Sequence, residues 1–239
     1  MKGYSSLPGI ILAAGGSRRM GCEQKLLLQW RQKPIIQVSL ESCLELGLKK
    51  IFVVTGYQSS EIEAILALMS PQVSTLGSDL DSRRGTSESG KLNQKGHFAK
   101  PVQDQSYVST VYNPEWERGL GTSISKGMEE VNKLDCEGVF VTLGDLPLVK
   151  VDTMMRLCHA FLERPHFAFR PYYNGRPGHP AIFPKSWFKD LSQLKGDIGG
   201  SQVMKKRMGE VVRVDVNDPG IYKDIDSPAD LDFLRKGLL

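Results

Sequence analysis

The sequence predicts an α/β fold, and two observations carry that prediction. Short apolar runs rich in β-branched residues, such as 51–55 and 138–143, alternate along the chain with longer segments of helical periodicity. Runs without polar alternation are typical of parallel strands that helices cover on both faces. We therefore expect a three-layer α/β/α sandwich around a mostly parallel, Rossmann-like sheet.

Each expected strand is a short run rich in Val, Ile or Phe, and each expected helix is longer, with apolar residues at helical spacing. In chain order, the strands are expected near 9–14, 51–55, 108–112, 138–143, 167–170, 180–183 and 211–214. The helices are expected near 34–46, 59–69, 121–133, 151–162, 186–194 and 199–207. Because 239 residues with 40% hydrophobic content can bury one large core, residues 1–239 are expected to form a single domain.

Residues 74–106 interrupt this alternation. Ser, Gly, Gln, Lys and Asp dominate there, and more than about 15 residues without periodicity is uncommon inside a compact domain. We interpret the segment as a mobile insertion. A hairpin, or a lid over the site, is the alternative interpretation.

Charge and composition exclude several classes of protein. The net charge of +4 is small and the basic residues are spread along the chain, so we expect small-molecule substrates and no nucleic acid partner. No run reaches the roughly 18 to 20 apolar residues that span a bilayer, and the N-terminus lacks a signal-peptide pattern, which predicts a cytoplasmic protein without a membrane partner. No C-x-x-C pair, and hence no zinc ribbon or dithiol motif, is formed by Cys22, Cys43, Cys136 and Cys158.

A glycine-rich turn follows the first expected strand. Two adjacent glycines, Gly15 and Gly16, let the backbone turn its N–H groups toward one point, and Ser17, Arg19 and Lys25 add a hydroxyl and two cations. This combination is suited to a polyphosphate, although a plain strand-to-helix turn also uses two glycines. The turn matches neither the G-x-x-x-x-G-K-[ST] nor the G-x-G-x-x-G pattern, which disfavours a Walker NTPase and a Rossmann dehydrogenase.

Carboxylates stand at two further places. Asp145 follows the expected strand 138–143, at the sheet edge where α/β proteins bind ligands, and is a candidate for Mg²⁺; capping of the next helix is the alternative. Asp224 and Asp226 lie on one face of an extended segment, where two like charges repel unless a cation lies between them. Ser227 and Pro228 begin a helix, so part of this string is capping.

Two turns in the C-terminal half carry groups suited to an anionic acceptor. Residues 173–180 form a stiff turn with the guanidinium of Arg176 and the imidazole of His179, and Asp197 lies in the glycine-rich segment 196–200. Hairpin turns use the same residue types, so a structural role is the alternative.

With these residues assembled, the chain resembles the MobA/MocA-like nucleotidyltransferases. The matching motifs follow the family's order: Leu12 to Gly21 with Lys25, Val54 to Tyr57, Asn113 to Ser123, Gly144 to Pro147, Gly175 to Pro180, and Asp224 to Leu231. Departures from the family pattern occur at Leu146, where Gln is frequent, and at Ser201, where an arginine is frequent. The resemblance covers nearly the whole chain outside 74–106 and implies a GT-A-like nucleotidyltransferase sheet.

The resemblance implies a reaction and a set of residues for it. The phosphate of molybdopterin attacks the α-phosphorus of a nucleoside triphosphate with Mg²⁺, or Mn²⁺, and pyrophosphate leaves. Catalytic roles are implied for Arg19, Lys25 and Asp145. Nucleotide binding is implied for those three and for Leu12, Ala13, Ala14, Gly15, Gly16, Ser17, Gly56 and Ser123. Acceptor binding is implied for Arg176, Gly178, His179 and Asp197, and metal binding for Asp145, Asp226 and Asp224.

The base, the acceptor and the partner follow from the same resemblance. Relatives that select GTP carry Gly where this chain has Ala14, so CTP is expected. A molybdenum hydroxylase is the expected recipient of the product. Three alternatives stay open: GTP as donor, a sugar phosphate as acceptor, and a non-catalytic protein that only carries the molybdenum cofactor.

Overall fold

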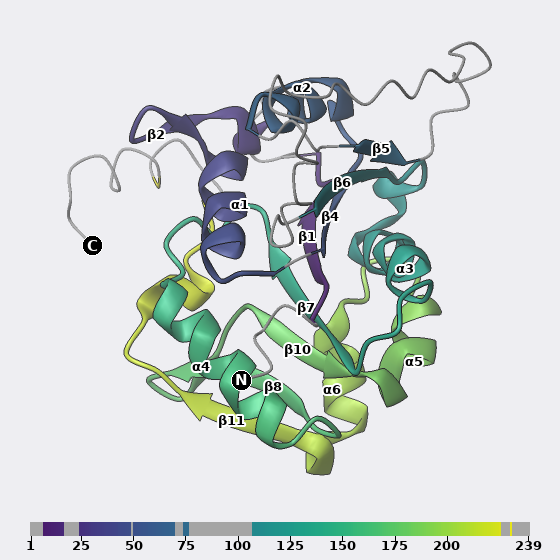
Figure 1. The fold of residues 1–239 in the computed structure, drawn as a ribbon, viewed down its shortest axis with the longest axis vertical. Coiled ribbons are helices and arrows are strands. Elements are labelled where there is room, and N and C mark those ends of the chain that lie inside the picture. Colours follow the sequence, from purple (N-terminus) through teal and green to yellow (C-terminus); the bar gives the residue numbers. More distant parts are fainter. Residues whose placement is uncertain are drawn as a thin grey trace, which may run out of the picture.

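A single mixed sheet runs through the molecule with helices on both faces, which confirms the expected α/β class (Figure 1). The structure is a computed structural model, and it describes residues 7–16, 24–48, 50–69, 74–76, 107–225 and 230. The strand order is β11-β8-β10-β7-β1-β4-β6-β5, with β9 paired to β8.

The strands of this sheet have the following bounds: β1 Gly9–Ala13, β4 Lys50–Thr55, β5 Ser74–Leu76, β6 Tyr107–Tyr112, β7 Gly138–Leu143, β8 Ala168–Tyr173, β9 Arg176–Pro177, β10 Ala181–Pro184 and β11 Val211–Asp215. A separate short hairpin joins β2 Gln29–Trp30 to β3 Lys33–Pro34, with Arg31 and Gln32 at positive φ. The helices are α1 Ile35–Glu45, α2 Ser59–Met69, α3 Leu120–Val131, α4 Val151–Glu163, α5 Phe188–Ser192 and α6 Gly200–Lys206.

The sheet is mostly parallel, as expected. From β5 through β6, β4 and β1 to β7 every pairing is parallel, and β11 is parallel to β8. The strand β10 runs antiparallel to both β7 and β8. Ser74–Leu76, at the start of the expected insertion, pairs with β6 as β5, and residues 77–106 lie outside the described part of the chain.

Two cores lie on the two faces of the sheet, because successive side chains of a strand point to opposite faces. From β1, Ile11 and Ala13 pack with α1, α2 and α4, whereas Ile10 and Leu12 pack with α3, α5 and α6. Burial on both faces explains the continuous apolar character of these strands.

The register brings four strand ends to one edge of the sheet. Ala13 of β1 pairs with Thr55 of β4, and Thr55 pairs with Tyr112 of β6. On the other side, Leu12 pairs with Leu143 of β7. The segments that follow these strands therefore emerge together, and the candidate site lies among them.

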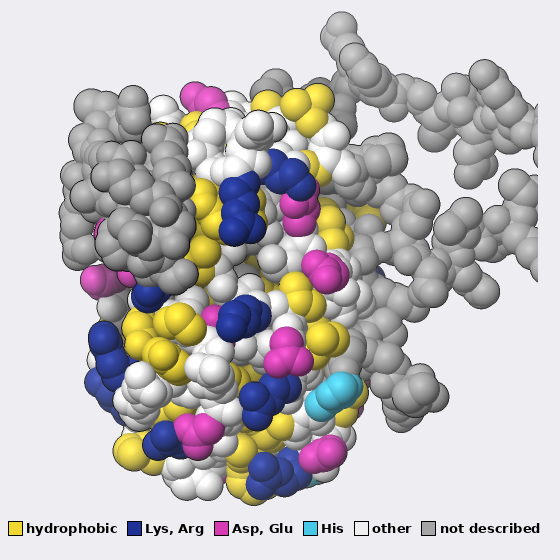
Figure 2. All heavy atoms as spheres, turned by 90° about the vertical axis from the view of Figure 1, so that its left-hand side faces the viewer, with side chains coloured by type: hydrophobic (Ala, Val, Ile, Leu, Met, Phe, Trp, Pro, Cys, Tyr) yellow, Lys and Arg dark blue, Asp and Glu magenta, His cyan; other side chains and the backbone are white. Residues whose placement is uncertain are grey.

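The surface over α1 and α4 carries charges of both signs. Figure 2 shows Lys and Arg side chains intermixed with Asp and Glu on this face, without a region of one sign. Among the described residues, no helix has the length and hydropathy needed to cross a bilayer.

Candidate functional site

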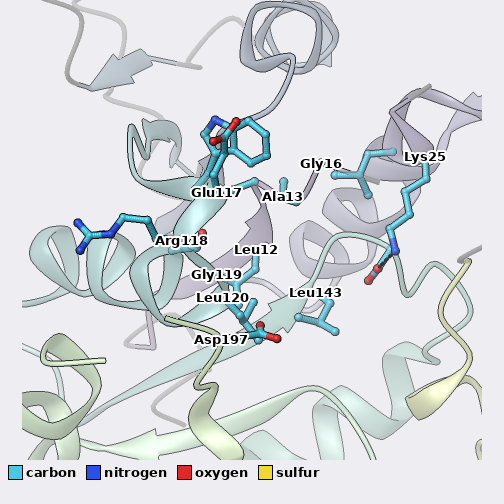
Figure 3. Close-up of a pocket in the computed structure, with 16 residues that line it drawn as sticks. Leu12, Ala13, Gly16, Lys25, Glu117, Arg118, Gly119, Leu120, Leu143 and Asp197 are labelled. Carbon is cyan, nitrogen blue, oxygen red and sulfur yellow. Dashed lines mark ion pairs between the residues drawn. The ribbon is translucent and has the colours of Figure 1, made fainter. Parts of the chain in front are cut away.

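A cavity of about 570 Å³ opens at the carboxyl edge of the parallel strands. Three of its walls are residues 12–16 at the end of β1 and just beyond it, residues 116–120 leading into α3, and the end of β7 with Asp145 (Figure 3). Lys25 and Asp197 complete it from other parts of the chain. This is the edge where open α/β sheets bind their ligands.

Hydrogen bonds hold the backbone of the glycine turn. The Ala14 carbonyl accepts from the Tyr57 N–H at 3.2 Å. The buried Gln24 amide donates to the carbonyls of Gly15, at 3.1 Å, and Tyr57, at 3.2 Å. The turn is therefore tied to the end of β4 rather than left as a free loop.

Two glycines of this region are required by the close approach of Trp116. A Cβ on Gly16 would lie 2.8 Å from the Trp116 ring, and a Cβ on Gly56 would lie 2.6 Å from its Cβ atom. The Trp116 ring lies 5.5 Å from the Tyr57 ring, centroid to centroid. The indole thus forms a fixed wall of the cavity, and Gly56 supports that wall without lining the cavity itself.

The entrance to α3 is organised by a buried amide. Asn113 is 2% exposed and donates to the hydroxyls of Thr122 and Ser123, each at 3.0 Å. Its side-chain oxygen accepts from the Glu115 N–H at 3.0 Å. These bonds fix Ser123, which lines the cavity.

The turn that carries Asp197 packs directly on this entrance. Gly119 has φ +112°, and a Cβ there would lie 2.5 Å from the backbone of Gly196. The Gly121 N–H donates to the Gly196 carbonyl at 2.9 Å. Asp197, expected from the sequence to face the acceptor, therefore lies in the same cavity as the glycine turn (Figure 3).

Lys25 and Asp145 form an ion pair in the cavity. Lys25 Nζ lies 2.5 Å from Asp145 Oδ2, and each side chain is 15% exposed. Two hydrogen bonds of Gly144 fix the chain between β7 and Asp145. The Gly144 N–H donates to the Leu12 carbonyl, and the Gly144 carbonyl accepts from the Ser39 hydroxyl at 2.8 Å. Two of the three residues with implied catalytic roles, which lie 120 positions apart in the sequence, are thus in contact.

Asp145 fits a divalent cation. Its Oδ1 atom is buried and has no hydrogen-bond partner in the described part of the chain. An unsatisfied buried carboxylate oxygen is costly unless it has a ligand, and Mg²⁺ and Mn²⁺ prefer such oxygens. Nucleotide phosphates usually supply further ligands of such an ion, so a single protein carboxylate is compatible with a metal site in this cavity.

The acidic segment near the C-terminus contacts the backbone of Asp145. The Ile225 N–H donates to the Asp145 carbonyl at 3.2 Å, which places the backbone next to Asp224 at the exit of β7. Asp226 lies outside the described residues, as do Ser17 and Arg19. Within the described ranges, no three His, Cys, Asp or Glu side chains form a metal-binding group.

The residues expected to bind the acceptor, at positions 176–179, lie in different surroundings. His179 lines a second, smaller cavity, whereas Arg176 and Gly178 line neither cavity. The Arg176 guanidinium instead lies 4.5 Å from the centroid of the Tyr222 ring. Gly178 is required by close packing, because a Cβ there would lie 2.4 Å from Ile221.

The environment of His179 favours its neutral form. Burial, and to a smaller extent the nearby Arg170 cation, together lower the pKa of this imidazole to about 4. Its Nδ1 atom is buried without a hydrogen-bond partner among the described residues.

Sequence reasoning missed part of the cavity wall. Trp116, Glu117 and Arg118 line it without having been assigned a role, although the small residues at Gly16 and Gly56 are a signal that a large side chain lies close. Arg118 points away from the cavity centre and pairs with Glu115 (Figure 3). Lys25 is therefore the basic side chain that enters the cavity from the described ranges.

The structure is that of an α/β protein with a ligand-sized cavity at the carboxyl edge of its parallel strands, and the comparisons with known proteins specify the family. Residues 9–89 and 92–211 match the model of the MobA-like NTP transferase domain, and the chain belongs to that family. Membership supports a nucleotidyltransferase activity.

Two relatives match along nearly their full lengths. Molybdenum cofactor cytidylyltransferase of Escherichia coli (strain K12) is 27% identical over 226 residues, covering 95% of this chain and 94% of that protein. Purine catabolism protein PucB of Bacillus subtilis (strain 168) is also 27% identical, over 233 residues and 97% of each protein.

Solved structures share the GT-A-like fold. A nucleotidyl transferase from Methanothermobacter thermautotroptrophicus superposes with a TM-score of 0.68 at 20% identity, covering 97% of both chains. Rv0371C from Mycobacterium tuberculosis H37Rv, solved in complex with manganese, gives a TM-score of 0.65 at 19% identity, covering 97% of this chain and 98% of that chain.

Proposed function

We propose that this protein transfers CMP from CTP to the phosphate of a molybdopterin acceptor and releases pyrophosphate. The observation that carries the proposal is the meeting of the glycine turn, Lys25 and Asp145 in one cavity of about 570 Å³. A cavity of this size suits a nucleotide. The similarity to molybdenum cofactor cytidylyltransferase supports the choice of donor and acceptor.

The chemistry requires positioning and charge stabilisation rather than a strong base. An acceptor phosphate oxygen forms a bond to the α-phosphorus of CTP, and the bond from that phosphorus to the bridging oxygen breaks, releasing pyrophosphate. Because the attacking phosphate is already ionised, no proton has to be removed. Lys25 stabilises negative charge on the triphosphate, while the turn at 14–16 and the Trp116 wall hold the nucleoside. Arg19 is proposed as a second cation.

Asp145 is proposed to hold Mg²⁺, or Mn²⁺, through its unsatisfied Oδ1 atom, with Asp224 or Asp226 as a second support. The ion would supply Lewis-acid stabilisation of the phosphate oxygens. On this proposal Asp145 and Lys25 act together, because the ion would bind Oδ1 while Lys25, 2.5 Å from Oδ2, is held beside the same carboxylate, where it can contact the phosphates.

Ala14 is proposed to favour the smaller base. It is 4% exposed and lies in the cavity wall, where its methyl group narrows the space beside the nucleoside. One methyl group in a tight pocket is worth about 1–3 kcal/mol, so preference for CTP over GTP is expected to be moderate.

The test measures pyrophosphate with Mg²⁺, each nucleoside triphosphate in turn, and the pterin acceptor. CTP is expected to give pterin-dependent release, and Ala14→Gly is expected to move the preference toward GTP. A clear preference of the unsubstituted protein for GTP would contradict the choice of donor. Release with a sugar phosphate instead of pterin would contradict the choice of acceptor, and cofactor binding without turnover would identify a carrier protein.

A further inference from the structure

A second, smaller cavity adjoins the nucleotide cavity and shares three wall residues with it, Leu12, Leu120 and Leu143. We call it the inner chamber. Its volume is about 50 Å³, several times the roughly 10–15 Å³ that one ordered water requires. Most of its wall is apolar, with side chains from β7, β10, α3 and α6. A group of several atoms on a ligand in the main cavity could enter it.

Arg170 and His179 are the two ionisable residues in the wall of the inner chamber. On β8, Ala168 belongs to the core beneath α3 and α6, and Phe169 belongs to the opposite core. Arg170, two positions after Ala168, therefore faces the chamber side of the sheet. Its Nε atom donates to the Gly178 carbonyl at 2.9 Å, which fixes the guanidinium beside the residue that precedes His179.

The charge of Arg170 is not matched. No carboxylate pairs with it in the described part of the chain, although it is half-buried and burial lowers its pKa. Buried cations are normally paired, because removing a charge from water is costly. Arg213 on the neighbouring strand β11 pairs in register with Arg170 but is exposed, and its guanidinium lies 2.6 Å from the carboxylate of Asp215.

His179 adds a second unsatisfied group to the same chamber. Its buried Nδ1 atom has no hydrogen-bond partner from the described ranges, while its backbone N–H donates to the Ile221 carbonyl at 2.6 Å. A neutral imidazole with the proton on Nδ1 is a hydrogen-bond donor. Arg170 and His179 thus bring a guanidinium and an imidazole to an otherwise apolar wall, and with the proton on Nδ1 the pair would be complementary to an anion.

We propose that the inner chamber is an anion subsite, in which Arg170 and His179 bind a compact anionic group of carboxylate size. One part of this inference, the identity of the ligand, rests on the proposed function. On that function, the acceptor would carry this second anionic group in addition to its attacking phosphate. Anion binding itself requires no nucleotide transfer.

Acetate and acetamide are matched probes, because they are nearly the same size and differ in charge. The measurement is the ¹⁵N spectrum of the imidazole nitrogens, in which the His179 signal is assigned by its loss in His179→Gln. Acetate in the millimolar range is expected to shift this signal, whereas acetamide is expected to leave it unchanged. Arg170→Met is expected to weaken the acetate response about tenfold or more, and Arg170→Lys is expected to retain part of it. Arg213→Met, which removes the neighbouring but paired guanidinium, is the matched control and should leave the response unchanged.

An equal response to acetamide, no response to acetate, or an acetate response that survives Arg170→Met would each overturn the anion subsite. Thermal unfolding of each variant verifies that the protein is folded. The assignment to the acceptor has a separate readout: Arg170→Met should raise KM for the acceptor and leave KM for CTP unchanged. An unchanged acceptor KM would refute that assignment, and absence of any transfer would refute the proposed function while the acetate result still stands.

Discussion

Asp145 and Asp218 are both carboxylates with little exposure, and their hydrogen bonds differ completely. Asp218 is 1% exposed and accepts from the Lys150 N–H at 2.9 Å, the Thr153 hydroxyl at 2.7 Å and the Gly220 N–H at 3.0 Å. Asp145 has Lys25 on one oxygen and, within the part of the chain that the structure describes, no hydrogen-bond partner on the other. Asp218 ties the start of α4 to the segment after β11, whereas Asp145 is left incomplete in a cavity.

The difference separates a structural carboxylate from a functional one. A buried acid whose hydrogen bonds all come from its own chain gains nothing from a ligand, and its loss leaves donors without partners. A buried acid with an unsatisfied oxygen is completed only by binding. The substitutions below test whether this distinction predicts the effects on stability and on turnover.

Asp145→Asn is expected to have the largest effect. If the carboxylate holds a divalent cation, its loss should lower kcat by about 10³-fold, or roughly 4 kcal/mol. The melting temperature should change little, because the amide keeps the size of the side chain. Pyrophosphate release as a function of Mg²⁺ concentration measures the turnover and its metal dependence, and water proton relaxation measures Mn²⁺ binding separately. A variant with the metal dependence of the unsubstituted protein would contradict the proposed role of Asp145.

Lys25→Ala is expected to have the second-largest effect on activity. Removal of the cation from the triphosphate should lower kcat/KM for the nucleotide by about 10²-fold. Lys33→Ala is the matched control, since Lys33 is exposed and pairs with Glu41 at 2.7 Å outside the cavity. Equal activity of the two variants would argue that Lys25 serves only to neutralise Asp145.

Asp218→Ala should show the opposite pattern from Asp145→Asn. It removes three hydrogen bonds and leaves two backbone N–H groups unsatisfied, so the free energy of unfolding should fall by about 2 kcal/mol. Urea unfolding measures this loss. Turnover per folded molecule should stay near that of the unsubstituted protein, and a large fall in kcat would break the distinction between the two acids.

His179 is expected to have the smallest effect, confined to acid pH. Its pKa lies at about 4 in the folded protein, below the ordinary 6.5, so the unfolded chain binds more protons between these values. Stability from this group is therefore complete above pH 6.5 and decreases as the pH falls toward 4. His179→Gln should flatten that part of the curve of unfolding free energy against pH, and an unchanged curve would show that the imidazole is not held neutral.

The sequence predicted the elements well because they depend on local patterns. The strands at 51–55 and 138–143 are apolar on both faces, and this property alone indicates a covered parallel sheet. The hairpin of β2 and β3 was not predicted, since two-residue strands carry no periodicity. β5 was assigned to the insertion because its pairing with β6 joins segments distant in the chain.

The sequence predicted the site residues that follow the ends of strands, but not the residues whose place in the site depends on side-chain packing. The glycine turn and Asp145 were found because parallel strands bring their carboxyl ends to one edge. Trp116 enters the wall only because Gly16 and Gly56 leave room for its ring, and no periodicity reveals that contact. In the sequence Arg170 is an ordinary polar residue of a strand, and only the structure shows that no carboxylate from the described ranges pairs with it.

Gly119 and Gly121 meet the 195–198 turn backbone against backbone. Since no side chain separates the two segments, the main chain itself fixes the distance between the start of α3 and the turn that carries Asp197. Side-chain substitutions elsewhere in the cavity wall are therefore expected to change which ligands fit, while this spacing stays the same.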